Sequence, residues 1–148
     1  MKYDNMDEKI NNLPMLPTIV VKLMTLSPQD NAYFDKVLEF IENVKEFGCR
    51  IAIDDFGTGY SNFEYLLQLK ADYIKIDGSM IKNIDKDSDA KIVVSTIVDF
   101  AKKMNIKTIA EFVKDDKIQS IVKDMGIDYS QGFYFSEPTQ ELKKDTII

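Results

Sequence analysis

The sequence of 148 residues contains no histidine and a single cysteine, Cys49. One cysteine excludes an internal disulfide, and a chain without histidine lacks the usual ligand of zinc and copper. No apolar run approaches the roughly 18 residues that a membrane span needs, and the first residues lack the basic-then-apolar pattern of a signal peptide. We therefore expect a cytoplasmic protein that is not embedded in a membrane.

Positive charge is also scarce, because 19 Lys and Arg residues against 25 Asp and Glu residues give a formal net charge of −6. No basic cluster is larger than short pairs such as Lys102-Lys103. An acidic surface repels nucleic-acid backbones, so we expect no bulk nucleic acid as a partner. Hydrophobic residues make up 45% of the chain, which suits one domain that buries roughly 68% of its unfolded surface.

From Tyr33 onward the sequence alternates between helical and strand patterns. Helices are expected over residues 34–45, 62–69, 89–104 and 115–125, and strands over residues 50–55, 73–77, 107–113 and 129–135. Strand and helix in strict alternation predict an α/β fold with a parallel sheet.

Within the predicted strand 73–77 (YIKID), isoleucines alternate with Tyr73, Lys75 and Asp77. Ile74 and Ile76 are expected to face covering helices, whereas Lys75 and Asp77 face the opposite side of the sheet. Inward polar groups near the ends of parallel strands are typical of a barrel mouth, so we predict a (βα)4 half of a TIM-type barrel. The polar residues at the predicted strand ends are Asp54, Asp55, Lys75, Asp77, Glu111 and Gln131.

Two adjacent carboxylates, Asp54 and Asp55, end the first of these strands and lead into a loop hinged by Gly57 and Gly59. Such acids suit a divalent cation, and without histidine an oxygen-ligated Mg²⁺ or Mn²⁺ fits better than zinc. Taken alone, the same pair often only ends a strand and caps the next helix. Taken singly, Lys75 has a simple interpretation as a snorkelling residue at a sheet end and Glu111 as a solvated strand end. Asp77 is expected to bind backbone amides.

The first 32 residues differ in character from the rest. Residues 18–26 are interpreted as a short apolar helix, ended by Ser27-Pro28, so residues 1–32 form an appended helical segment ahead of an α/β domain over residues 33–148. The stretch 13–30 resembles the start of an HDOD domain, a noncatalytic signalling module.

Four motifs occur in order along the chain: residues 54–61 (DDFGTGYS), 75–77 (KID), 110–113 (AEFV) and 131–136 (QGFYFS). From about residue 46 to residue 138 they resemble the C-terminal half of an EAL domain, a family that hydrolyses cyclic di-GMP to linear pGpG. The resemblance implies that Asp54 and Asp55 bind the catalytic metals and that Glu111 binds the second one. It also implies that Lys75 helps to activate water and that Gln131 positions water and substrate.

The resemblance also shows differences from the family. The Glu-Ala-Leu motif, an asparagine and a glutamate of the family's first half have no counterpart here, and Phe112, Lys114 and Glu137 replace typical residues. We therefore expect a signalling protein that is weakly active or inactive by itself, with cyclic di-GMP as ligand. A homodimer, or a partner that completes the barrel, would cover the open edges of a half-barrel. The alternatives are a noncatalytic sensing or interaction module that uses its strand edges and residues 56–61, and a fragment without a selected function.

Overall fold

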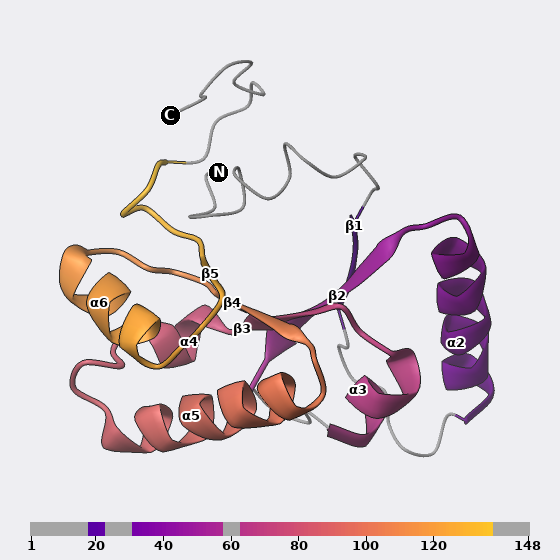
Figure 1. The fold of residues 1–148 in the computed structure, drawn as a ribbon, viewed down its shortest axis with the longest axis horizontal. Coiled ribbons are helices and arrows are strands. Elements are labelled where there is room, and N and C mark those ends of the chain that lie inside the picture. The colour runs from indigo at the N-terminus through magenta and orange to yellow at the C-terminus, as the bar shows by residue number, and fades with distance from the viewer. Residues whose placement is uncertain (1–17, 23–30, 58–62, 138–148) are drawn as a thin grey trace.

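A computed structural model describes residues 18–22, 31–57 and 63–137, and these residues form a parallel sheet flanked by helices (Figure 1). The five strands lie in the order β1-β2-β3-β4-β5 and all neighbours pair in parallel. The strands are β1 Thr18–Lys22, β2 Arg50–Phe56, β3 Tyr73–Ile76, β4 Lys107–Ala110 and β5 Tyr129–Ser130. The helices are α2 Asn31–Glu46, α3 Phe63–Leu69, α4 Gly78–Ile81, α5 Ser88–Lys103 and α6 Asp116–Asp124. The α/β fold with parallel strands is thus confirmed.

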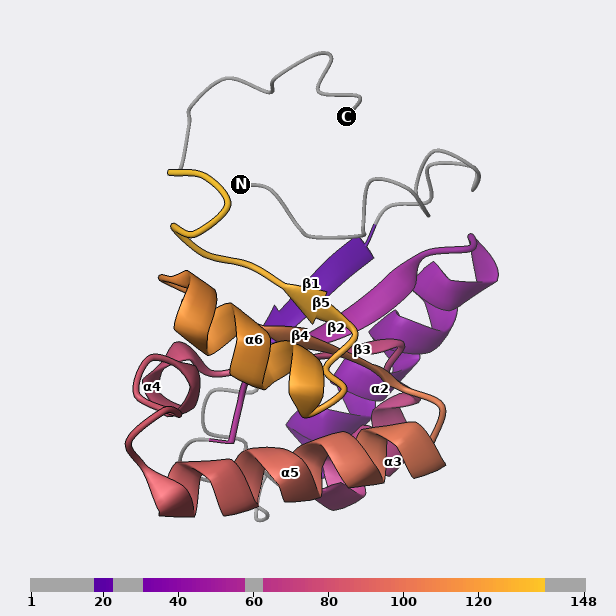
Figure 2. The same cartoon turned by 60° about the vertical axis from the view of Figure 1, so that its left-hand side comes forward.

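One face of the sheet carries the main core. Ile51 and Ile53 of β2 and Ile74 and Ile76 of β3 have no exposed surface, and they pack with buried residues of the helices in a single cluster. Figures 1 and 2 show α2, α3 and α5 on this side of the sheet. The apolar helix stripes and the alternate strand residues predicted this layer, because each can leave water only by packing against the other.

The opposite face of the sheet carries a smaller cluster of Ala52, Tyr73, Ile109 and Tyr129. Side chains alternate along a strand, so the residues two positions further on, at the carboxyl ends, lie on this same face. These residues are Asp54, Lys75, Glu111 and Gln131. The sheet therefore has one aliphatic face and one face that changes from apolar to polar toward the carboxyl ends of its strands.

The helix predicted over residues 18–26 is wrong over Thr18–Lys22, which forms β1 and pairs in register with β2 from Thr18↔Arg50 to Lys22↔Asp54. The run Thr18-Ile19-Val20-Val21 is entirely β-branched, and such side chains fit a pleated strand better than a helix. Residues 23–30 and most of the HDOD-like stretch lie outside the described residues. The division of the chain at residue 32 stays a prediction.

Smaller differences concern lengths. β4 ends at Ala110 and β5 at Ser130, earlier than the predicted 113 and 135, and the short helix α4 was not predicted. The other four helices and the start of each later strand agree with prediction to within a few residues. In the part of the chain that the structure describes, no helix has the length and apolar character to cross a membrane.

Candidate functional site

The carboxyl ends of β2, β3 and β4 bring three predicted site residues into contact. Lys75 on β3 lies between Asp54 on β2 and Glu111, which follows β4. Its Nζ is 3.1 Å from Oδ1 of Asp54 and 2.8 Å from Oε1 of Glu111. The three side chains are 13%, 20% and 11% exposed respectively. Lys75 and Glu111 are thus neither snorkelling nor solvated groups, because each is largely buried against an opposite charge.

Asp55 joins this group through an irregularity in the strand. Adjacent residues of a regular strand point to opposite faces, but the pairing of β2 with β3 shifts register between Ile53 and Phe56, and Asp55 has a left-handed φ of 53°. Aspartate tolerates this conformation better than most residues. As a result, ligand oxygens of Asp54, Asp55 and Glu111 all lie within 4.8 Å of one another. We call these three residues the acidic cluster.

Like charges lie close together in the acidic cluster. Its three carboxylates share a half-buried space, and Lys75 forms ion pairs with two of them, Asp54 and Glu111. Burial alone would lower the pKa of Lys75, but its contacts with the negative charges of Glu111 and Asp54 outweigh burial and raise that pKa. Burial raises the pKa of Glu111, and the charges of Asp54 and Asp55 add to this effect against the opposing influence of Lys75. A bound divalent cation would reduce the repulsion among the three carboxylates.

Two buried oxygens near the strand ends have no hydrogen-bond donor among the described residues, namely Oδ1 of Asp54 and Oε1 of Gln131. The contact of Lys75 with Asp54 is therefore an ion pair without hydrogen-bond geometry. Buried polar atoms are normally satisfied, so the Gln131 oxygen, which has no ion pair among these residues either, is open to an ion, a water or a ligand. Together with the three carboxylates it forms an all-oxygen donor set of the kind that Mg²⁺ and Mn²⁺ prefer, so the residues present fit a divalent metal.

Gln131 is positioned by β5 and by the loop after it. Its backbone N–H donates to Ala110 O at 2.8 Å, and its carbonyl accepts from Val113 N at 3.0 Å, which places it beside Glu111. The side chain is 7% exposed. Gly132 follows with a φ of 155°, and a Cβ at this position would collide with the backbone of Val113. The glycine thus permits the close approach that buries Gln131.

Asp77 has the structural role predicted for it, because its Oδ1 accepts the Ser79 N–H at 2.7 Å and caps α4. Residues 58–62 of the glycine-hinged loop lie outside the described residues. The sequence interpretation missed the position of Lys22, the last residue of β1, which pairs in register with Asp54. The β-branched run before it was the signal that could have placed this strand at the site.

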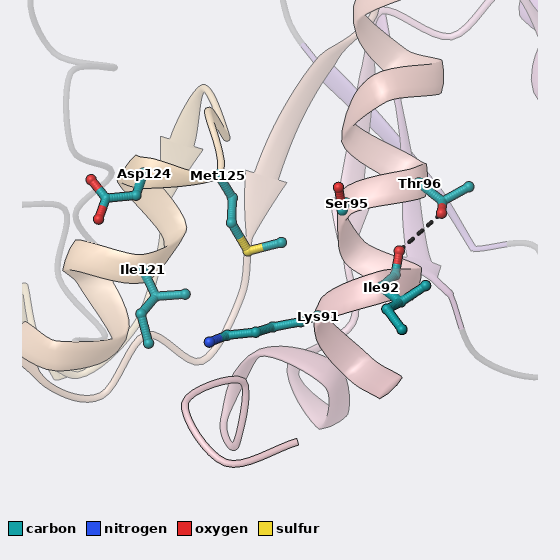
Figure 3. Close-up of a pocket in the computed structure, with 7 residues that line it drawn as sticks. All are labelled: Lys91, Ile92, Ser95, Thr96, Ile121, Asp124 and Met125. Carbon is teal, nitrogen blue, oxygen red and sulfur yellow. Dashed lines mark hydrogen bonds between the residues drawn. The ribbon is translucent and has the colours of Figure 1, made fainter. Parts of the chain in front are cut away.

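The chain also has a groove of about 550 Å³ between α5 and α6 (Figure 3). Lys91 of α5 extends toward α6, and Met125 extends toward α5 from the turn that ends α6. No member of the acidic cluster lines it. We do not include this groove in the candidate site.

A model of the EAL domain family matches residues 9–138. The chain belongs to the EAL domain family. This match begins well before residue 46, where the sequence resemblance was placed, and it includes β1. The HDOD likeness of residues 13–30 stays a prediction.

Relatives of this EAL chain have names that refer to cyclic di-GMP. It is 44% identical over 98 residues to the probable cyclic di-GMP phosphodiesterase PdeA of Escherichia coli K12. It is 37% identical over 105 residues to the cyclic di-GMP phosphodiesterase PdeA of Borreliella burgdorferi. The alignments cover 66% and 71% of this chain but 13% and 16% of the two relatives, so the chain spans a small part of their length.

Solved structures of EAL proteins share the fold. The PaMucR phosphodiesterase in complex with c-di-GMP is 36% identical with a TM-score of 0.72, and the match covers 82% of this chain and 47% of that one. Klebsiella pneumoniae BlrP1 with manganese and cyclic di-GMP is 28% identical with a TM-score of 0.73, over 82% and 30% of the two chains. The sheet described above thus matches EAL structures of the TIM-barrel type, as the polar residues at the predicted strand ends indicated.

Proposed function

We propose that this EAL chain binds cyclic di-GMP beside a divalent metal, Mg²⁺ or Mn²⁺, held by Asp54, Asp55 and Glu111. The observation that carries the proposal is the position of the ligand oxygens of Asp54, Asp55 and Glu111 within 4.8 Å of one another, near the buried Oε1 of Gln131, which has no hydrogen-bond donor among the described residues. The names of the relatives supply the ligand. Hydrolysis to linear pGpG is the corresponding reaction, and this chain performs it weakly or not at all by itself.

When bound, the metal would neutralise phosphate charge and lower the pKa of a bound water. The residues of this chain then have distinct tasks. Lys75 lies between two members of the acidic cluster and holds a positive charge there, which suits the orientation of an attacking water. Gln131 offers a buried amide with an unused oxygen, which suits a contact to water or substrate.

Self-association is part of the proposal. The sheet has two edges, β1 and β5, and Val20 on β1 is 53% exposed. Unpaired parallel edges tend to bind further strands, so two copies related by a two-fold axis, with β1 of one beside β5 of the other, would close the barrel. Sedimentation of the purified chain tests this. A folded monomer at micromolar concentration would contradict it.

A noncatalytic sensor is the second candidate. The position of Lys75 favours this candidate. The ammonium of Lys75 already lies between Asp54 and Glu111 and competes with a metal for their oxygens. In that case cyclic di-GMP or a protein partner binds and no bond is broken.

Calorimetry with cyclic di-GMP and Mn²⁺, run beside a hydrolysis assay, separates the two candidates. Turnover that Asp54→Asn abolishes supports the phosphodiesterase, and binding without turnover supports the sensor. If the wild-type chain binds neither Mn²⁺ nor cyclic di-GMP, the phosphodiesterase and the cyclic di-GMP sensor are both wrong, and only the binding of a protein partner remains.

A further inference from the structure

Phe112 follows Glu111 at the edge of the acidic cluster, and its backbone and its side chain are both unusual. Its φ is 59°, and its side chain is 67% exposed. A left-handed backbone is uncommon for a bulky residue and costs free energy that the surroundings must offset. A mostly exposed aromatic ring buries little apolar surface, so hydrophobic burial offsets little of that cost. Neither property is explained by the fold alone.

The other left-handed residues have local explanations. Among the described non-glycine residues, positive φ values occur at Asp55, Lys70, Asn105 and Phe112. Lys70 and Asn105 come just after α3 and α5, where helices commonly end in this conformation. Asp55 lies at the register shift of β2 and contributes to the acidic cluster. Phe112 is the remaining case, and it also adjoins that cluster.

The ring of Phe112 lies on Gly78, the first residue of α4. A Cβ built on Gly78 would overlap Cδ2 and Cγ of the ring, far inside van der Waals contact. Gly78 has no positive φ, so its backbone does not require glycine. The absent side chain makes room for the ring. The contact therefore holds the ring against the Gly78 backbone along the edge that contains Cγ and Cδ2, while most of the residue stays open to solvent.

The position of this ring relative to the metal site follows from the backbone bonds. The N–H of Glu111 donates to Ile76 O at 3.3 Å, so the residues after β3 and after β4 run side by side. Asp77 and Gly78 come directly after Ile76, and Phe112 comes directly after Glu111. The ring thus lies at the rim of the site, one residue from a carboxylate of the acidic cluster.

We propose that Phe112, supported by Gly78, is a stacking platform for a nucleobase of the ligand. The inference rests on the proposed function, because it assigns a ligand contact at the same site. A ring that is held in place along one edge and is otherwise open to solvent can present a face on which a base stacks, and stacking tolerates any base because every base has a π face. The neighbouring acidic cluster would hold the metal and, through it, the phosphate.

Four variants test the platform. Phe112→Gly removes the ring and accepts the positive φ without strain, and Phe112→Leu keeps apolar bulk without an aromatic face. Phe112→Trp keeps an aromatic face. Gly78→Ala leaves Phe112 unchanged but displaces its ring, and alanine is favourable in a helix. Thermal melts verify that each variant folds. If one of the variants that remove or displace the ring does not fold, the comparison uses the remaining ones.

The probes are cyclic di-GMP, guanosine 5′-monophosphate and inorganic phosphate, each titrated by calorimetry with Mn²⁺ present. We expect Phe112→Gly, Phe112→Leu and Gly78→Ala to lower the affinity for both guanine nucleotides about tenfold. Phe112→Trp should preserve this affinity. Affinity for inorganic phosphate and for Mn²⁺ alone should stay within twofold of wild type, because neither has a base to stack.

Several results would overturn the platform. Unchanged or tighter nucleotide binding in Phe112→Gly would mean that the ring is idle or obstructs the site. An equal loss for inorganic phosphate would mean that the ring only supports the acidic cluster. A change in sedimentation without a change in nucleotide affinity would make the ring part of a protein interface. If wild type binds Mn²⁺ and inorganic phosphate but neither nucleotide, the stacking platform is refuted while the metal site stands. If wild type does not bind Mn²⁺, the proposed function itself is refuted.

Discussion

Acidic residues gather at both ends of the parallel strands, and their surroundings differ. At the amino ends, Asp72 precedes β3 and accepts the N–H of Ile51 at 2.7 Å, and its carboxylate lies 3.3 Å from Nζ of Lys45. Two strands later the arrangement repeats. Asp128 precedes β5, accepts the N–H of Thr108 at 3.0 Å and pairs with Lys107 at 2.8 Å.

At the carboxyl ends two acids share one cation. Lys75 pairs with both Asp54 and Glu111, and Asp55 lies in the same cluster. At the amino ends each aspartate has its own lysine and a backbone N–H of the neighbouring strand, so it stabilises the sheet. The shared cluster instead places like charges close together, and a bound cation would reduce their repulsion. Under the proposed function, the same residue type thus stabilises the sheet at one end of the strands and binds a cation at the other.

The largest expected effect is a difference in Mn²⁺ affinity between two variants, each with one aspartate exchanged at one end of the strands. We expect Asp54→Asn to weaken Mn²⁺ binding about 100-fold or more, because it removes a charged ligand from the acidic cluster. Asp72→Asn is the matched control, since the same chemical change at the opposite end should leave Mn²⁺ affinity unaltered. Calorimetric titration of Mn²⁺ measures both, and an equal loss in the two variants would contradict the division between the ends.

The converse effect concerns stability. Asp128→Ala should lower the free energy of unfolding by about 2 kcal/mol, because the N–H and hydroxyl of Thr108 and the ammonium of Lys107 all lose their acceptor. Urea denaturation measures the change. Mn²⁺ affinity should be unaffected, and a variant as stable as wild type would show that these bonds contribute nothing net.

A smaller effect is expected when the cation between the acids is removed. Lys75→Gln leaves three carboxylates without their ammonium, so the metal-free variant should be less stable and should gain more from a metal than wild type does. We expect added Mn²⁺ to stabilise the variant by roughly 1 kcal/mol more than it stabilises wild type. Thermal melts with and without MnCl₂ give this difference. A smaller metal response in the variant would mean that Lys75 assists metal binding.

The smallest effect is a pH dependence at the amino ends. Burial would raise the pKa of Asp128, but hydrogen bonds from Lys107 and Thr108 outweigh it and lower the pKa below its ordinary value of 3.8. A lowered folded pKa contributes stability that is present above the unfolded pKa and is lost as the pH falls through the folded one. The stability difference between wild type and Asp128→Ala should therefore be constant from pH 7 to 5 and shrink as the pH falls toward 3. Denaturation curves across this range provide the measurement, and a difference that grows on acidification would contradict it.

Agreement between sequence and structure was best where the signal is local. The helices from residue 31 onward follow apolar stripes with helical spacing, and the strands β2 and β3 follow short apolar runs bounded by turns. Asp54, Lys75 and Glu111 were expected at neighbouring strand ends, and the ion pairs of Lys75 bring them together. This followed from the parallel order of strands, because carboxyl ends of neighbouring parallel strands share one edge.

Prediction failed where pairing between distant segments decides the outcome. Thr18–Lys22 has the β-branched composition of a strand, yet its short apolar run was interpreted as a helix, and its pairing with β2 identifies it as a strand. The ends of β4 and β5 were placed too late, because loops after parallel strands continue the same apolar composition without a partner. Phe112 was noted as unusual for the family, but its contact with Gly78 was not foreseen.

Composition and periodicity, which depend on near neighbours in the chain, were enough to predict an acidic α/β protein with carboxylates at its strand ends. Three features needed the folded chain: the register shift that turns Asp55 toward Asp54, the position of Lys75 between two carboxylates, and the support of the Phe112 ring by Gly78. Each joins segments that lie far apart in sequence or depends on the pairing of two strands. No local pattern encodes such distances, because they arise only when the strands pack side by side.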